Sequence, residues 1–177
     1  MDLQVEAQVR TVGAGRAVDK LAGKYMTFQL AEEIYGLGVL EVREIIGLME
    51  IARVANAPGF IRGVINLRGR VIPVIDLRIQ FGMSACAATE QTVIIVVQCE
   101  LAGRSLTIGL LVDRVLEVLS FQADQIEPPP DFGSASAGAF IVGVGKAGAR
   151  IVFLLGIAQI LSPREADAVL GAAPRPV

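Results

Sequence analysis

Residues 36–45 read GLGVLEVREI, and residues 109–118 read GLLVDRVLEV. The first glycine, a leucine, two valines and a glutamate match at one constant offset. Further along the chain, FIRGV at residues 60–64 matches FIVGV at residues 140–144 at a second constant offset. Because glycines and a charged residue match along with the aliphatic residues, we interpret these stretches as two copies of one unit rather than as chance similarity.

The repeat determines the predicted domain organisation. Each copy consists of short apolar runs separated by Gly, Asn and charged residues, which is typical of an all-β fold. A unit of roughly 60 residues is marginally stable alone, so we expect the copies to pack their apolar faces together. We predict a flexible tail over residues 1–23, a first β barrel at about 24–82, a second at about 90–161, a C-terminal helix over 163–170 and a tail over 171–177.

Apolar runs predict the strands, and capping residues predict two short helices. Asp76 can cap a helix ahead of residues 77–81, and Ser162 with Glu165 forms a capping box after which Pro163 opens the last helix. The predicted strands cover residues 24–30, 34–40, 48–54, 63–67, 70–75, 91–98, 104–112, 114–119, 139–145 and 149–155.

The composition excludes several kinds of site. None of the 177 residues is a histidine, which removes Ser-His and Cys-His nucleophile pairs and most zinc sites. A net charge of −2 and an aromatic content of 5% disfavour nucleic acid as a partner. No apolar run reaches the about 20 residues that a spanning helix needs. Cys86 and Cys99 are predicted to be free thiols in a reducing cytoplasm. We expect no cofactor and no metal.

Carboxylate and thiol chemistry is also not indicated. Glu44 and Glu117 occupy equivalent positions of the repeat, so we expect each to do the same structural work in its own copy. Asp76 and Asp113 could form a catalytic pair only if folding brought two carboxylates together. Cys99 lies in an apolar run with no histidine to activate it. We therefore expect no enzymatic activity.

Protein recognition remains as the main hypothesis. Residues 62–70 read RGVINLRGR, and the segment from Asn66 to Gly69 predicts a hairpin turn between two apolar strands. An arginine held on a rigid turn beside apolar residues is typical of an interface anchor. Arg68 is therefore a candidate binding residue.

Four motifs resemble the CheW family of bacterial chemotaxis coupling proteins, and the likeness extends from about Tyr25 to Leu161. The motifs are YGLGV at 35–39, VREII at 42–46, GVINLRG at 63–69 and IPVIDLR at 72–78. The resemblance implies an all-β CheW-like domain at 24–170, made of two SH3-like five-stranded β barrels packed on a shared hydrophobic core.

The resemblance also implies a function and a set of partners. The chain would be a non-enzymatic adaptor that joins the regulatory domain of the histidine kinase CheA to the cytoplasmic tips of chemoreceptors, the methyl-accepting chemotaxis proteins. It would be cytoplasmic, recruited to receptor arrays at the inner membrane without inserting into it, and monomeric in isolation. The implied receptor contacts are Val42, Glu44, Ile45, Gly63, Arg68 and Val93. The implied kinase contacts are Ile51, Arg53, Asp131 and Phe132.

Several alternatives stay open. Val42 and Ile45 could be core residues, and Gly63 could be needed only for its backbone. Gly38 stands where many family members carry Asp, which is expected to loosen a strand, and Glu127 stands where a basic residue is common. The competing hypothesis is a β barrel that binds a small ligand or catalyses a reaction. A deep polar pocket with a perturbed carboxylate favours that hypothesis, whereas a shallow apolar groove with an arginine at its rim favours the adaptor.

Overall fold

The computed structural model describes residues 18–101, 103–130 and 138–172. The chain is rich in strands, and its helices are short. The strands are β1 (Gly23–Leu30), β2 (Glu33–Gly38), β3 (Val42–Gly47), β4 (Ile61–Leu67), β5 (Arg70–Asp76), β6 (Val93–Leu101), β7 (Arg104–Val112), β8 (Arg114–Phe121), β9 (Ile126–Glu127), β10 (Ile141–Ala147) and β11 (Arg150–Leu155). The helices are the 3-10 turns η1 (Val39–Glu41), η2 (Ala123–Gln125) and η3 (Ile157–Gln159) and the α-helices α2 (Leu77–Gln80) and α3 (Pro163–Ala172).

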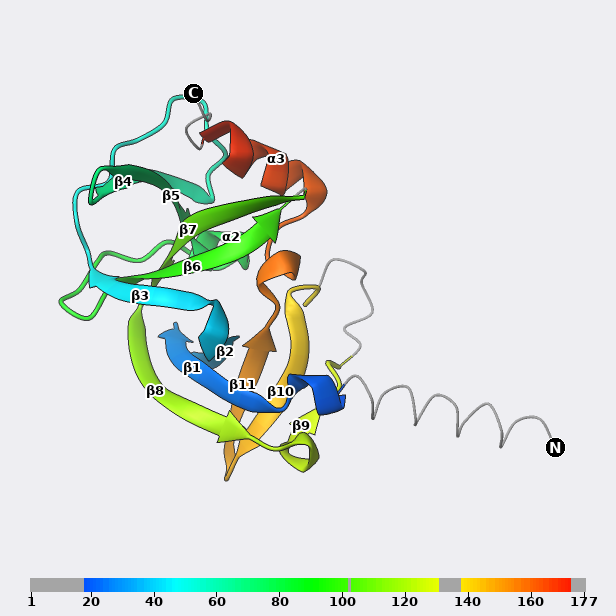
Figure 1. Cartoon of the computed structure of the whole chain (residues 1–177). Coiled ribbons are helices and arrows are strands. Elements are labelled where there is room, and N and C mark those ends of the chain that lie inside the picture. Colours follow the sequence, from blue (N-terminus) through cyan, green and yellow to red (C-terminus); the bar gives the residue numbers. More distant parts are fainter. Residues whose placement is uncertain (1–17, 102, 131–137, 173–177) are drawn as a thin grey trace.

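The strands form two curved sheets that lie against each other (Figure 1). One sheet has six strands in the order β8-β1-β2-β11-β10-β9, where β9 is only two residues long. The other has five strands in the order β3-β6-β7-β5-β4. We name them the terminal barrel (β1, β2 and β8–β11) and the central barrel (β3–β7). The predicted fold class, two small β barrels on a shared core, is confirmed.

The two barrels do not follow the two halves of the sequence. The third strand of each copy crosses over, because β3 pairs with β6 and β8 pairs with β1. Each sheet also contains one parallel pair that joins a strand of one copy to a strand of the other: β2 with β11, and β5 with β7. The predicted continuous barrels at 24–82 and 90–161 are therefore wrong. An apolar strand can pair equally well with a strand of either copy, so its sequence does not specify the partner.

The exchange preserves the symmetry of the repeat. Gly36 pairs with Leu154 across β2 and β11, and Gly109 pairs with Val74 across β7 and β5. Gly36 and Gly109 are equivalent in the repeat, and the second offset makes Val74 equivalent to Leu154. The matching registers support the alignment of the two copies.

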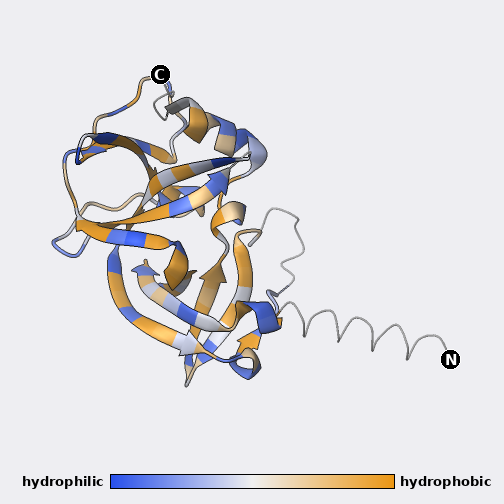
Figure 2. Cartoon of the chain, in the orientation of Figure 1, coloured by the Kyte–Doolittle hydropathy of each residue, from blue (hydrophilic) through white to orange (hydrophobic). Residues whose placement is uncertain are grey.

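The main hydrophobic core lies between the barrels. Phe28 and Leu37 from the terminal barrel pack with Ile95 and Leu110 from the central barrel, and all four side chains are fully buried. Each barrel also encloses a smaller cluster, around Phe121 in the terminal barrel and around other aliphatic residues in the central barrel. Figure 2 shows hydrophobic residues along the strands of both sheets.

One predicted strand is wrong, and the prediction contains neither β3 nor the two-residue strand β9. Residues 48–54 contribute only an isolated bridge between Ala52 and Val64, although this segment was predicted to be a strand. The strand lies earlier, at β3, where half-buried and exposed residues alternate. Charged residues at Arg43 and Glu44 hide this pattern in the sequence. The predicted strand 34–40 ends at Gly38, which still pairs with Tyr25, and then turns into η1.

Both predicted helix caps are present. The Asp76 carboxylate accepts a hydrogen bond from the Arg78 amide at 3.0 Å and begins α2. Before α3, the Ser162 amide donates to the Glu165 carboxylate at 2.8 Å, and the Glu165 amide donates to the Ser162 hydroxyl at 3.2 Å. This helix continues through Gly171 to Ala172, beyond its predicted end.

Part of the predicted tail is packed. Residues 18–21 form a helical turn with Val18 buried against the terminal barrel core. The Tyr25 hydroxyl donates to the Leu21 carbonyl at 2.6 Å, which ties this turn to β1. Among the described residues, no helix is long and apolar enough to cross a bilayer.

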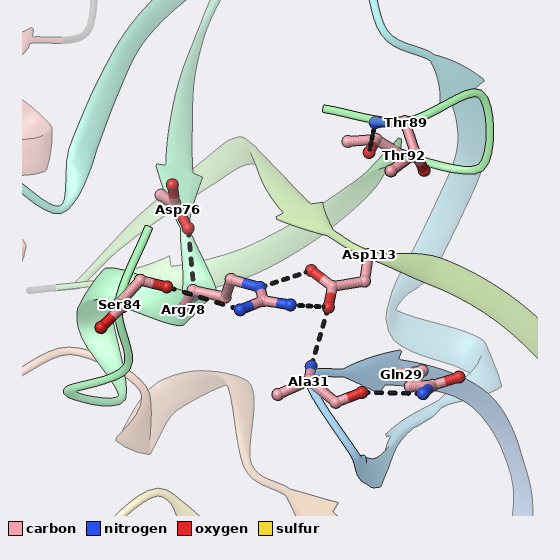
Figure 3. A network of polar contacts seen from close by, with 8 residues as sticks. All are labelled: Gln29, Ala31, Asp76, Arg78, Ser84, Thr89, Thr92 and Asp113. Atoms are coloured by element: carbon pink, nitrogen blue, oxygen red, sulfur yellow. Dashed lines mark hydrogen bonds and ion pairs between the residues drawn. The ribbon is translucent and has the colours of Figure 1, made fainter. Parts of the chain in front are cut away.

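An ion pair holds three elements together where β7 passes into β8 (Figure 3). Arg78 on α2 donates from Nε to Asp113 Oδ1 at 2.7 Å and from a terminal nitrogen to Oδ2. The same Oδ2 accepts the amide of Ala31, in the turn between β1 and β2, at 2.7 Å. Burial alone would raise the pKa of Asp113, but the hydrogen bonds from Arg78 and Ala31 and the Arg78 charge lower it overall. We name this contact the Arg78–Asp113 clasp.

Candidate functional site

The hairpin between β4 and β5 presents Arg68 to solvent. The Asn66 side chain accepts the Gly69 amide at 2.9 Å, and Arg68 has a left-handed backbone conformation with φ 53°. Its side chain is 73% exposed, as predicted for a turn residue. Both terminal nitrogens donate to Glu44 on β3, at 2.7 and 2.8 Å. This bidentate ion pair fixes the plane of the guanidinium.

The Arg68–Glu44 pair also determines the charge state of Glu44. The hydrogen bonds from Arg68, and secondly its positive charge, lower the pKa of the Glu44 carboxyl. Glu44 is therefore ionised at neutral pH. An exposed ion pair contributes little to stability, so its main effect is to position the arginine.

The other predicted receptor contacts on β3 and β6 differ in exposure. A shift of register between Val42 and Glu44 turns the strand, and Val42 packs half-buried against the main core. Ile45 is 40% exposed. Val93 lies opposite Gly47 at the end of β6 and is half-buried against the main core. Of these three, Ile45 offers the most surface to a partner.

The backbone conformation and the close packing at position 63 both require a glycine. It is buried in β4 with φ +148°, a conformation that favours glycine. A Cβ atom there would collide with the Ala52 carbonyl oxygen and would lie 2.8 Å from the Ile51 side chain. The residue is needed for close approach of the 51–52 segment to β4, so a direct receptor contact stays a prediction.

A shallow apolar groove lies beside the arginine hairpin. It encloses roughly 340 Å³ and is lined by Met49, Ala52, Val64, Ile65 and Val71, with Glu50 and Asn66 at its polar positions. Val71 is 43% exposed there. An apolar groove next to a fixed arginine is the arrangement expected of a surface that binds another protein.

The predicted kinase contacts are only partly described. Ile51 is half-buried against the core of the central barrel, while Arg53 is exposed. Both line a smaller groove of roughly 240 Å³, together with Arg62 and Leu111. Asp131 and Phe132 lie outside the described residues. The contact of Ile51 with Gly63 brings residues assigned to different partners together.

The repeat places a second set of exposed apolar residues on the terminal barrel, beyond the predicted receptor contacts. Ile45 and Val118 are equivalent, as are Val71 and Ile151, and all four are exposed. The equivalence extends to the glutamates, because Glu44 and Glu117 each bind an exposed arginine: Arg150 lies 3.0 Å from Glu117, and Arg68 lies 2.7 Å from Glu44. The two arginines are not equivalent, since the repeat places Arg150 on Arg70. The alignment of the two copies already carried this signal. The terminal barrel therefore has a related apolar face beside its own arginine.

Glu127 is also accounted for in the structure. It lies on the two-residue strand β9, and its carboxylate pairs with Lys146 on β10 at 2.8 Å. Both side chains are exposed, so the pair remains available to a charged partner.

The buried thiol of Cys99 is not activated as a nucleophile. Burial, and secondly the charge of Glu41, raises the pKa of Cys99 to about 11, so this thiol stays protonated at neutral pH. Burial also raises the pKa of Glu41, whose groove contains no stronger nucleophile than that thiol. Within the described part of the chain, no three acidic or thiol side chains gather as a metal site.

Comparison with known proteins agrees with the fold. A model of the CheW-like domain matches residues 24–165. The chemotaxis protein CheW of Klebsiella aerogenes is 40% identical over 153 residues, which cover 84% of this chain and 90% of that protein. The chemotaxis protein CheW of Rhizobium meliloti is 33% identical over 143 residues, covering 81% and 90%.

A solved structure gives the same result. The crystal structure of the scaffolding protein TtCheW from Thermoanaerobacter tengcongensis superposes with a TM-score of 0.71 and 35% identity, covering 81% of this chain and 97% of that one. The two sequence relatives and the solved structure each cover more than four-fifths of this chain. The chain therefore belongs to the CheW family of chemotaxis proteins.

Proposed function

We propose that this protein is a non-enzymatic adaptor that couples the histidine kinase CheA to the cytoplasmic tips of chemoreceptors. It acts in the cytoplasm and is recruited to receptor arrays at the inner membrane. Its relatives are chemotaxis proteins, and the solved relative is described as a scaffolding protein, which supports this role.

The observation that carries the proposal is the Arg68–Glu44 pair beside an apolar groove. The pair holds a guanidinium in one orientation at the surface, at 2.7 and 2.8 Å from the carboxylate oxygens. The neighbouring groove is lined mainly by apolar side chains. A fixed arginine beside apolar surface favours recognition of another protein, because both groups gain from losing water in a complementary interface.

The proposed receptor surface consists of Val42, Glu44, Ile45, Gly63, Arg68 and Val93. Arg68 and Ile45 make direct contact, Glu44 positions Arg68, and Gly63 maintains the backbone under the hairpin. The proposed kinase surface contains Ile51, Arg53, Asp131 and Phe132, and binds the regulatory domain of CheA. The contact between Ile51 and Gly63 makes the two surfaces neighbours.

Arg68→Glu is expected to weaken binding to a purified receptor cytoplasmic fragment by roughly thirtyfold, the size of effect typical of an interface anchor. The melting temperature should stay almost unchanged, because the lost ion pair is exposed. Arg150→Glu is the matched control, since Arg150 forms a comparable exposed pair with Glu117 in the terminal barrel. Calorimetric titration and circular dichroism measure both quantities.

The double variant Glu44→Arg with Arg68→Glu separates positioning from direct contact. It restores an ion pair with its charges exchanged, so stability should stay close to that of the native chain. Receptor binding should stay weak, because the partner then meets a carboxylate where the guanidinium stood. Full recovery of binding in the double variant, or equal losses in Arg150→Glu and Arg68→Glu, would contradict the proposed role of Arg68.

A further inference from the structure

The chain passes between the barrels at two equivalent positions of the repeat. One passage is η1, between β2 and β3, and the other is at Asp113, between β7 and β8. The alignment of residues 36–45 with 109–118 places Leu40 on Asp113. The offset that places Leu77 on Ile157 places Arg78 on Ala158. Both members of the Arg78–Asp113 clasp are therefore replaced at the other passage.

At η1 there is a groove where, at the other passage, the Arg78 side chain lies. A groove of roughly 340 Å³ lies between η1, β6 and η3, with Cys99, Ile157 and Ala158 among its apolar lining residues. Leu40 lines it with a side chain that is 95% exposed. At the equivalent passage, the Arg78 side chain is only 18% exposed and reaches Asp113 (Figure 3).

The groove is lined by acidic groups. Glu41 and Glu100 both line it, and neither takes part in any of the ion pairs recorded among the described residues. Burial raises the pKa of Glu41, so a cation placed beside it would offset part of the cost of its charge. The one arginine at the groove, Arg43, donates instead to the Gln98 side chain.

We propose that this groove is a docking surface for a partner protein that inserts an arginine, in the position that Arg78 occupies at the other passage. The guanidinium pairs with Glu41 and Glu100 above the Ala158 position, and Leu40 packs on an apolar residue beside the arginine. The small side chain of Ala158 leaves room for a planar fork, which matches carboxylates better than a point charge does.

A protein suits this surface better than a free cation. Leu40 is almost fully exposed, and an apolar side chain in that state gains from contact only with another apolar group. Leu40 also borders a second groove of roughly 440 Å³ with Leu21, Tyr25 and Val39. None of the residues named at the groove between η1, β6 and η3 belongs to the proposed receptor or kinase surface. This inference therefore does not depend on those assignments.

Three blocked tripeptides test the chemistry on the full chain by amide NMR: Leu-Arg-Leu, Leu-Lys-Leu and Leu-citrulline-Leu. The arginine peptide should cause saturable shifts at Leu40, Glu41 and Cys99. The citrulline peptide has the same shape without the charge and should bind at least about tenfold more weakly. The lysine peptide should fall between them. Absence of saturable shifts, or equal binding of arginine and citrulline peptides, would overturn the proposal.

Two acidic variants locate the site. Glu41→Gln should weaken the arginine peptide by about tenfold, because it removes a charge-assisted hydrogen bond. Glu127→Gln removes an exposed carboxylate of β9 and should leave the affinity unchanged. Equal effects of the two variants would show only a general attraction to an acidic surface, and the proposal would be wrong.

A rebuilt clasp tests the equivalence of the two passages. Leu40→Asp and Ala158→Arg both change exposed residues, so each single variant should fold. In the double variant, the upward shift in melting temperature should exceed the sum of the shifts of the two single variants. The double variant should also no longer bind the arginine peptide. Strictly additive effects on stability would show that the two side chains do not meet, and the groove would then not be the counterpart of the clasp.

Discussion

Gly63 and Arg68 belong to the same hairpin, yet they have different roles. Arg68 is exposed and held by Glu44, so its side chain is available to a partner. Gly63 is buried beneath Ala52, and its role is to let two backbone segments approach. The motif GVINLRG therefore combines a contact residue with a residue that shapes the surface around it.

Gly63→Ala should destabilise the protein by about 3 kcal/mol, measured by urea unfolding. The new Cβ would force a residue into a conformation at φ +148° and into the Ala52 carbonyl oxygen. Gly69→Ala is the control, because Gly69 also has positive φ, +84°, but nothing lies within 4 Å of its Cβ position. It should cost about 1 kcal/mol from backbone strain alone. Similar losses in the two variants would show that close approach does not matter.

At the scale of elements, the Arg78–Asp113 clasp joins α2, the turn between β1 and β2, and the passage from β7 to β8. These segments belong to both barrels, so the clasp ties the barrels to each other. The pKa of Asp113 is lowered in the folded chain, which links this tie to pH. A carboxyl with a lowered folded pKa contributes stability above its unfolded pKa and loses it as pH falls through the folded pKa.

Acid unfolding of the native chain and of Asp113→Asn tests that link. The difference between their free energies of unfolding should be constant from pH 7 to about pH 5, well above the ordinary aspartate pKa of about 3.9. It should shrink as the pH is lowered further, because the unfolded native chain then takes up a proton first. A difference that grows below pH 4 would contradict the assigned direction.

At the scale of the whole molecule, the strand exchange makes the two copies dependent on each other. β3 finds its partner in β6, and β8 finds its partner in β1. Neither copy can therefore complete a sheet alone, although each carries the same series of strands. The main core is likewise shared between the barrels.

Fragments of residues 18–82 and 90–172 should each be unfolded in isolation by circular dichroism and amide NMR. Each fragment leaves its third strand without a partner and half of the main core exposed. An equimolar mixture should recover folded signals, since the missing strands are then supplied by the other fragment. A fragment that folds alone would show that the strands can also pair within one copy.

The sequence alone determined the strand-rich fold, the internal repeat, both helix caps and the exposed arginine of the hairpin. These features depend on local patterns: apolar runs, capping residues and turn residues act on their near neighbours along the chain. The sequence also showed which residues of the two copies are equivalent. For the candidate site, it identified Arg68 from the turn residues and Glu44 through a family motif, but not the contact between them.

Only the tertiary structure decided which strands pair. β3 and β8 cross to the other copy, and nothing in their residues distinguishes one partner strand from another of the same apolar character. Which apolar residues are exposed was also decided only by the tertiary structure. Ile45 and Val118 look like core residues in the sequence, but they are exposed because no other element packs on their faces of the strands. Pairing and exposure depend on residues far apart in the chain, whose approach is a property of the folded molecule as a whole.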